Sequence, residues 1–235
     1  MNMEFFIEGI RIQIFNSDSE RDELPFVIVN CDRNEADTLY EKVKSLTDID
    51  FVLIAVNVPN WNDDLSPWPS DPVFRGTASF GGKADAYLSL LSDRILPETE
   101  VLLLAKGKRP AYLALGGYSL AGLFALHCAY RSDLFSKIIS ASGSLWYPGF
   151  LEFTQKEEIS DRVDSVYLSL GDKESHTRNP LMARVEENTG KIAHGLSGTL
   201  NVCFEMNEGN HFKDPELRMA KGIAWILKSG SVPSR

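Results

Sequence analysis

The chain has 235 residues, 43% of them hydrophobic, and carries a formal net charge of −9. This length suits one domain with a substantial core, and we expect residues 1–235 to form a single α/β domain. The acidic balance disfavours nucleic acid and anionic membrane surfaces as partners.

The start of the chain and its cysteines indicate a cytoplasmic protein. Residues 1–8 carry acids where a secretory signal would have a basic end. The longest apolar stretches, 51–56 and 101–105, are too short to span a bilayer. The three cysteines are odd in number and widely spaced, which favours reduced thiols over a disulfide framework.

Strands alternate with helices along the chain, which predicts a mostly parallel sheet with helices on both faces. The elements expected in the first half are an antiparallel edge strand over 10–15, a short buried strand over 25–30, a helix through Leu39, Val43 and Leu46, a strand over 51–57, and a helix over 84–96 that Pro97 closes. Residues 101–109 fit either a strand or a helix.

One long stretch, residues 57–83, interrupts this alternation and is rich in proline. A connection of this length inside a compact domain is usually a functional rim or lid. It follows the carboxyl end of a predicted strand, so we expect it to rim a site at that edge. Its two tryptophans, Trp61 and Trp68, are expected to serve packing.

Residues 116–122 read Gly-Gly-Tyr-Ser-Leu-Ala-Gly and carry the main functional signal. An apolar run precedes them and a helix-prone run follows, as the strand–turn–helix context of a nucleophile elbow requires. Such a turn needs small residues two places before and two places after the serine. Gly117 and Ala121 meet this need, although Ala121 stands where glycine is usual. The motif predicts Ser119 as a nucleophile.

The second half supplies a base and an acid in the chain order that this architecture uses. Predicted strands at 165–170 and 199–206 end just before Asp172 and Glu174, and before His211, respectively. Because parallel strands end at one edge of a sheet, these side chains should meet Ser119 there. A strand over 137–141 and a last helix over 215–227 complete the expected elements.

The other histidines fit the role of base less well. His127 lies two turns beyond Ser119 on the same predicted helix, and His194 ends an amphipathic stretch. His176 shares a loop with the acids and is the one serious rival of His211. The spacings of metal-binding and nucleotide-binding motifs are missing from the sequence, so we expect no metal and no cofactor.

Four segments, 117–123, 140–146, 170–174 and 209–212, resemble the esterase branch of the α/β-hydrolases. This branch holds esterase D, enterochelin-esterase-like proteins and the mycobacterial mycolyltransferases. The resemblance runs from about Phe26 to the last helix and implies the α/β-hydrolase fold.

The same resemblance implies a role for each matching residue. Ser119 would be the nucleophile and His211 the base, and the acid would lie three residues past the strand-end glycine. That spacing selects Glu174 over Asp172. The oxyanion hole would use the backbone N–H of Leu120 and a second amide from a strand-end segment, which matches Arg33 or Asn34 here; Arg33 replaces the glycine of many relatives.

We therefore expect a serine esterase that cleaves a small-molecule ester through an acyl-enzyme. Tyr118 and Trp146 are expected to line the substrate pocket, although Trp146 fits ordinary packing equally well. Residues 146–164 are too few to build a separate cap domain, so the pocket should be shallow and open.

Three alternatives stay open at this point. An acyltransferase or a small peptidase could use the same residues, and a binding protein could keep the fold without the chemistry. A siderophore esterase is less favoured, because iron-loaded siderophores are anionic and this chain is acidic. The sequence does not fix the natural substrate or the oligomeric state.

Overall fold

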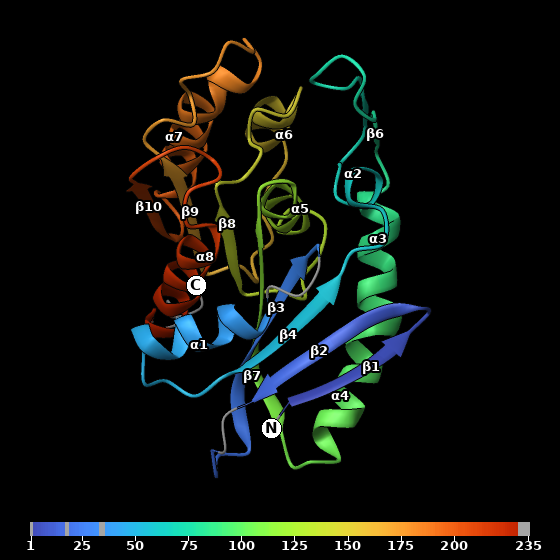
Figure 1. Cartoon of the computed structure of the whole chain (residues 1–235). Helices are drawn as coiled ribbons and strands as arrows, with labels where there is room; N and C mark the ends of the chain where they lie inside the picture. The colour runs from blue at the N-terminus through green and yellow to red at the C-terminus, as the bar shows by residue number, and fades with distance from the viewer. Residues whose placement is uncertain (1, 17–18, 33–35, 230–235) are drawn as a thin grey trace.

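The computed structural model describes residues 2–16, 19–32 and 36–229 (Figure 1). Within them, eight strands form one sheet in the order β1-β2-β4-β3-β7-β8-β9-β10. β1 and β2 pair antiparallel, as do β2 and β4, and the other neighbours pair parallel. The strands are β1 (Asn2–Ile7), β2 (Ile10–Asn16), β3 (Glu23–Cys31), β4 (Val52–Asn57), β7 (Arg109–Tyr118), β8 (Lys137–Ala141), β9 (Ser165–Gly171) and β10 (Asn201–Asn207).

Helices cover both faces of this sheet. Alternate residues of a strand point to opposite faces, and here both faces carry apolar side chains that pack against helices. Val27 and Val29 of β3 pack with α1 and α8, whereas Ile28 between them packs into the cluster on the other face. The helices are α1 (Ala36–Leu46) and α8 (Pro215–Lys228) on one face, and α3 (Ala84–Leu90), α4 (Leu96–Leu104), α5 (Leu120–Cys128), α6 (Phe150–Lys156) and α7 (Val185–Leu196) on the other.

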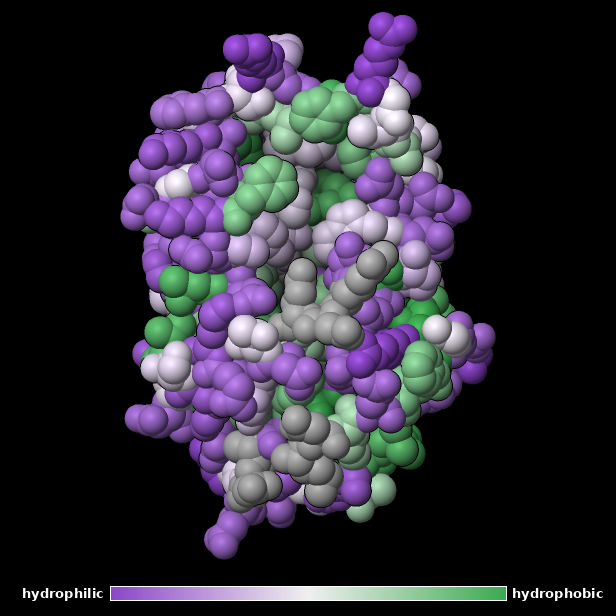
Figure 2. Space-filling view, viewed as in Figure 1, coloured by the Kyte–Doolittle hydropathy of each residue, from purple (hydrophilic) through white to green (hydrophobic). Residues whose placement is uncertain are grey.

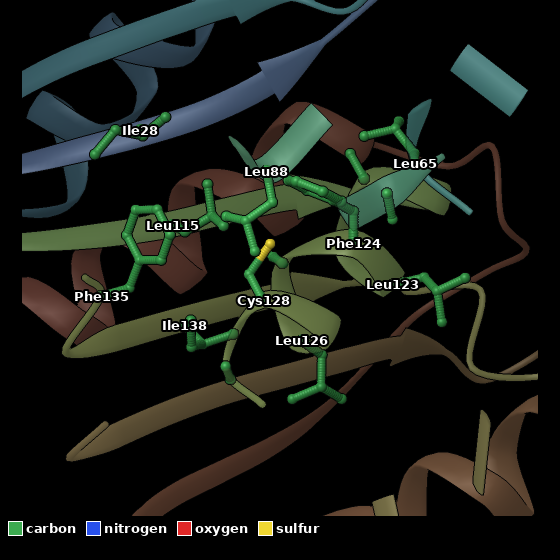
Figure 3. Packing of buried hydrophobic residues seen from close by; sticks show 14 of the residues in the cluster. Ile28, Leu65, Leu88, Leu115, Leu123, Phe124, Leu126, Cys128, Phe135 and Ile138 are labelled. Atoms are coloured by element: carbon green, nitrogen blue, oxygen red, sulfur yellow. The ribbon is translucent and has the colours of Figure 1, made fainter. Parts of the chain in front are cut away.

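Every residue of the helix α5 is buried, and all of them except His127 are apolar. Phe124 and Cys128 of α5 belong to one hydrophobic cluster with Leu115 of β7, Ile138 of β8 and Leu88 of α3 (Figure 3). A helix without a polar face is stable only inside a core. Its amino end, where Ser119 lies, is therefore held rigidly against the sheet.

Most predicted elements are confirmed, with two differences near the sheet edge and at Pro97. The strand over residues 10–16 is antiparallel as expected, but it is not the edge, because β1 pairs with its outer side. The ambiguous segment 101–109 is helical to Leu104 and begins β7 only at Arg109.

Pro97 does not close the helix that begins at Ala84. A π-helical turn, η1 (Leu91–Ile95), follows α3, and the N–H of Leu96 bonds to the carbonyl of Leu91. Pro97 then stands in the first turn of α4, where a residue needs no N–H donor. The change in hydrogen-bond register therefore lets the helix continue through the proline.

Residues 57–83 form the expected irregular segment, with the short helix α2 (Trp61–Asp64) and a two-stranded ribbon of β5 (Pro69–Ser70) and β6 (Phe80–Gly81). The indole N–H of Trp68 donates to the carbonyl of Pro148 at 2.9 Å. This hydrogen bond connects the irregular segment to the residues just before α6. Residues 146–164 hold one short helix, α6. None of the described helices is long and apolar enough to cross a membrane.

Candidate active site

Ser119 lies on the sharp turn between β7 and α5. Its φ of 59° and ψ of −121° place it in a region that residues other than glycine rarely adopt. A Cβ added at Gly117 would lie 2.4 Å from the Cβ of Ala121, so only glycine fits there. The small residues around Ser119 therefore permit the strained turn that exposes its hydroxyl.

The loop after β8 supports this turn from the neighbouring strand. The N–H of Ser119 donates to the carbonyl of Ala141 at 3.1 Å, and the N–H of Ser144 donates to the carbonyl of Ser119 at 3.0 Å. The hydroxyls of Ser144 and Ser119 lie 3.4 Å apart. Ser144 was not among the predicted site residues, and its place in the segment 140–146 is the one signal for it in the sequence.

His211 connects the serine to a carboxylate. Its Nε2 lies 3.0 Å from the Ser119 Oγ, and its Nδ1 lies 2.8 Å from the Glu174 Oε2. The His211 side chain is 26% exposed and that of Glu174 only 4%. The imidazole can therefore meet a ligand while the carboxylate is shielded from water.

Three donors hold the other oxygen of Glu174. Its Oε1 accepts the N–H of Gly171 at 2.7 Å, the hydroxyl of Ser142 at 2.8 Å and the Nη1 of Arg218 at 2.7 Å. Burial alone would raise the pKa of Glu174, but the hydrogen bonds from His211, Gly171 and Ser142 outweigh it, so this pKa is lowered. The carboxylate is thus ionised at neutral pH.

The rival acid, Asp172, has a different contact. Its Oδ1 accepts the N–H of Gly209 at 2.7 Å, and its own N–H donates to the carbonyl of Asn207. Gly209 has a φ of 99°, which favours glycine. Asp172 therefore fastens the turn that carries His211.

The remaining histidines lie elsewhere. His127 is buried in α5 with its Nε2 2.7 Å from Asp85, and burial lowers its pKa. His176 and His194 are exposed. Of the four histidines, His211 is the one whose ring hydrogen-bonds the hydroxyl of Ser119.

A cavity of about 330 Å³ opens beside Ser119 and His211. Tyr118 and Trp61 are among the described residues that line it, whereas Trp146, which we also expected in the substrate pocket, is not. Trp146 is 8% exposed and packs against Phe80 instead, because the turn after β8 directs it into the core. The other lining residues are Val29, Asn30, Cys31, Asp32, Ala36, Leu39, Phe212, Pro215, Glu216 and Met219.

The surface around this edge of the sheet is mixed in hydropathy. Figure 2 shows a hollow with near-white and hydrophobic (green) residues, bordered on both sides by hydrophilic (purple) residues. Phe212, next to His211, is 85% exposed. A substrate would therefore meet apolar side chains at the mouth of the site.

Two further expectations concern anion and metal binding. Leu120 is the first residue of α5, where backbone N–H groups have no partner within the helix. Arg33 and Asn34 lie outside the described residues. Over the ranges that the structure describes, no cluster of three His, Cys, Asp or Glu side chains could hold a metal ion.

Ser119 lies on a strained turn between a strand and a helix, on a mostly parallel sheet. It is hydrogen-bonded to a histidine that a buried carboxylate orients. This combination defines an α/β-hydrolase-fold protein of the serine hydrolase type. Residues 32–193 match the model of the family described as "Putative esterase". This match covers more than half of the chain, so the chain belongs to that family and is a carboxylic ester hydrolase.

The chain is also similar to individual proteins. The chain is 26% identical over 184 residues to the uncharacterized protein YbbA of Bacillus subtilis (strain 168), covering 75% of this chain and 73% of YbbA. It superposes on the siderophore hydrolase EstB from Aspergillus nidulans with a TM-score of 0.76 and 20% identity, covering 99% of this chain and 96% of EstB.

A second solved structure, an IroE-like serine hydrolase from Shewanella oneidensis, gives a TM-score of 0.77 at 16% identity, covering 97% of this chain and 80% of that one. At these identities the two structures show the shared fold.

Proposed function

We propose that Ser119, His211 and Glu174 form a catalytic triad that hydrolyses small carboxylic esters through an acyl-enzyme. One observation carries this proposal: an unbroken chain of hydrogen bonds, 3.0 Å from Ser119 to His211 and 2.8 Å from His211 to Glu174, that ends at an open cavity. Loss of ester hydrolysis on replacing Ser119 tests it.

The geometry supports a two-step reaction. In the first step the Ser119 oxygen attacks the ester carbonyl carbon, and His211 Nε2 takes the hydroxyl proton and passes it to the departing alcohol. In the second step water, deprotonated by the same nitrogen, attacks the acyl carbon, and Ser119 recovers its proton as the acid leaves. Glu174 stabilises the imidazolium in both steps, since its Oε2 faces Nδ1.

The tetrahedral intermediates need donors for their oxyanion. The N–H of Leu120, at the amino end of α5, is one proposed donor, and an amide of Arg33 or Asn34 is the other. Each such donor typically lowers the barrier by about 3 kcal/mol.

The cavity favours a small, apolar acyl group. Its described wall includes Val29, Ala36, Leu39 and Met219, which offer apolar surface. EstB, which has the same fold, is named a siderophore hydrolase, so siderophore esters belong in the substrate screen as a separate class.

We expect acetyl to butyryl esters to be hydrolysed with higher kcat/KM than dodecanoyl esters. A cavity of about 330 Å³ lies at the small end of ligand sites, and each methylene left in water forgoes about 0.8 kcal/mol. The measurement is kcat/KM across p-nitrophenyl esters, with and without a lipid emulsion. No interfacial activation is expected.

Leu39→Ala enlarges the same wall and should extend the preference by one or two carbons, while Leu46→Ala, on the same helix but outside the cavity lining, should leave it unchanged. A wild-type kcat/KM that climbs steadily to dodecanoyl would contradict this account of the cavity.

A further inference from the structure

Arg218 of α8 is a buried cation that touches all three loops of the site. It is 1% exposed, although a buried charge is costly unless it is fully paired. Its Nη1 lies 2.7 Å from the Glu174 Oε1, 2.9 Å from the Ser142 Oγ and 3.3 Å from the Tyr118 hydroxyl. This nitrogen thus contacts the acid, the loop after β8 and the residue before the nucleophile.

The other guanidinium nitrogen holds the loop of the base. Nη2 donates to the carbonyls of Glu208 and Asn210, at 3.1 and 2.9 Å, on either side of Gly209. The Tyr118 hydroxyl donates to the carbonyl of His211 at 2.5 Å, so a second contact of Arg218 reaches the same loop. Removing Arg218 would therefore release the acid and the base together.

Glycines make this close approach possible. A Cβ added at Gly171 would lie 2.7 Å from Nη2 of Arg218 and 2.2 Å from the carbonyl of Gly209. A Cβ at Gly222, one turn along α8 from Arg218, would lie 2.6 Å from Ile139 and 2.8 Å from Tyr167. Gly222 thus lets the helix approach the sheet far enough for the guanidinium to reach the site.

We propose that Arg218 is a positioning residue that fixes Glu174 and His211 relative to each other and sets the charge balance of the pair. This proposal rests on the proposed triad. The carboxylate divides its two oxygens: Oε1 is held by Arg218, and Oε2 faces His211. Because Glu174 is paired with a cation, it favours the imidazolium less than an unpaired carboxylate would. Loss of the Arg218 charge would therefore strengthen the attraction between Glu174 and a protonated His211.

The charged and titratable groups around His211 come from four elements. They are Glu174 from the loop after β9, Arg218 and Glu216 from α8, Tyr118 from β7 and Asp32 after β3. Arg218 is the cation of this set that bonds directly to the partner of His211.

The test separates charge from geometry. Arg218→Gln removes the charge and keeps a donor; we expect the acid limb of the kcat/KM profile to move about one pH unit higher. Arg218→Lys keeps the charge but cannot form all five contacts; we expect an unshifted limb and a kcat about tenfold to a hundredfold lower, with little change in KM. Lys228→Gln, an exposed cation on the same helix, is the control and should change neither.

The second readout does not need catalysis. NMR titration of the His211 ring, assigned with His211→Gln, should show its midpoint about one pH unit higher in Arg218→Gln, with exposed His194 as the internal reference. Arg218→Met removes the same charge if the glutamine variant does not fold.

The proposal would be overturned if the titration midpoint of His211 in Arg218→Gln or Arg218→Met equalled that of the wild-type protein. A kcat of Arg218→Lys equal to that of the wild-type protein would also overturn it. An esterase activity that survives Ser119→Ala would instead overturn the proposed triad, while the titration of His211 would still report on Arg218.

Discussion

Ser119→Ala should lower the kcat for p-nitrophenyl acetate by up to about a millionfold, because removing the nucleophile from a comparable triad costs that much. The substituted methyl group fits the turn as well as the hydroxymethyl does, so the thermal unfolding midpoint should change little. The measurement is kcat by a chromogenic assay, together with the unfolding midpoint by circular dichroism. Retention of a tenth of the wild-type activity would exclude Ser119 as the nucleophile.

The histidines provide a matched control for the same experiment. His211→Ala should lose as much activity as Ser119→Ala, since its Nε2 lies 3.0 Å from the serine hydroxyl. His176→Ala should keep most activity, because this side chain is exposed on the loop after β9. The reverse pattern would move the base to that loop.

Glu174→Gln should lower kcat by about ten-thousandfold, because the imidazole loses the charge that stabilises its cation and fixes its tautomer. The amide keeps the shape of the carboxylate. It leaves Arg218 with a weaker partner, so folding must be checked for this variant. The measurement is kcat at pH 8.

Asp172→Asn is the control for this loss, since the two acids stand two residues apart on one loop. Its amide oxygen can still accept the N–H of Gly209, so kcat should fall far less than in Glu174→Gln. If Asp172→Asn proved the more damaging change, the acid would have to be reassigned.

The parts of the site that short-range sequence patterns encode could be predicted. The turn at Ser119 depends on small neighbours within a few residues, and Asp172, Glu174 and His211 follow the ends of buried strands. Parallel strands bring such ends to one edge, so the meeting of these loops follows from element order alone. The spacing that the family resemblance implies then favoured Glu174 over Asp172 as the predicted acid.

The contacts that depend on long-range packing could not be predicted. Arg218 lies on an amphipathic helix, where an arginine is expected to face water, and only the approach of α8 to the sheet buries it. The positions of Trp61 and Trp146 relative to the cavity depend on how two separate loops turn. The prediction that Pro97 ends the helix was wrong because the π-helical turn before it has no clear sequence signature.

The most direct test of the proposed triad is labelling with a fluorophosphonate, followed by peptide mass mapping. We expect a single covalent adduct on Ser119 in the wild-type protein. We expect almost no adduct in His211→Ala, because without the base the hydroxyl is a weak nucleophile. An adduct on another residue, or undiminished labelling of Ser119 in His211→Ala, would contradict the proposal that His211 activates Ser119.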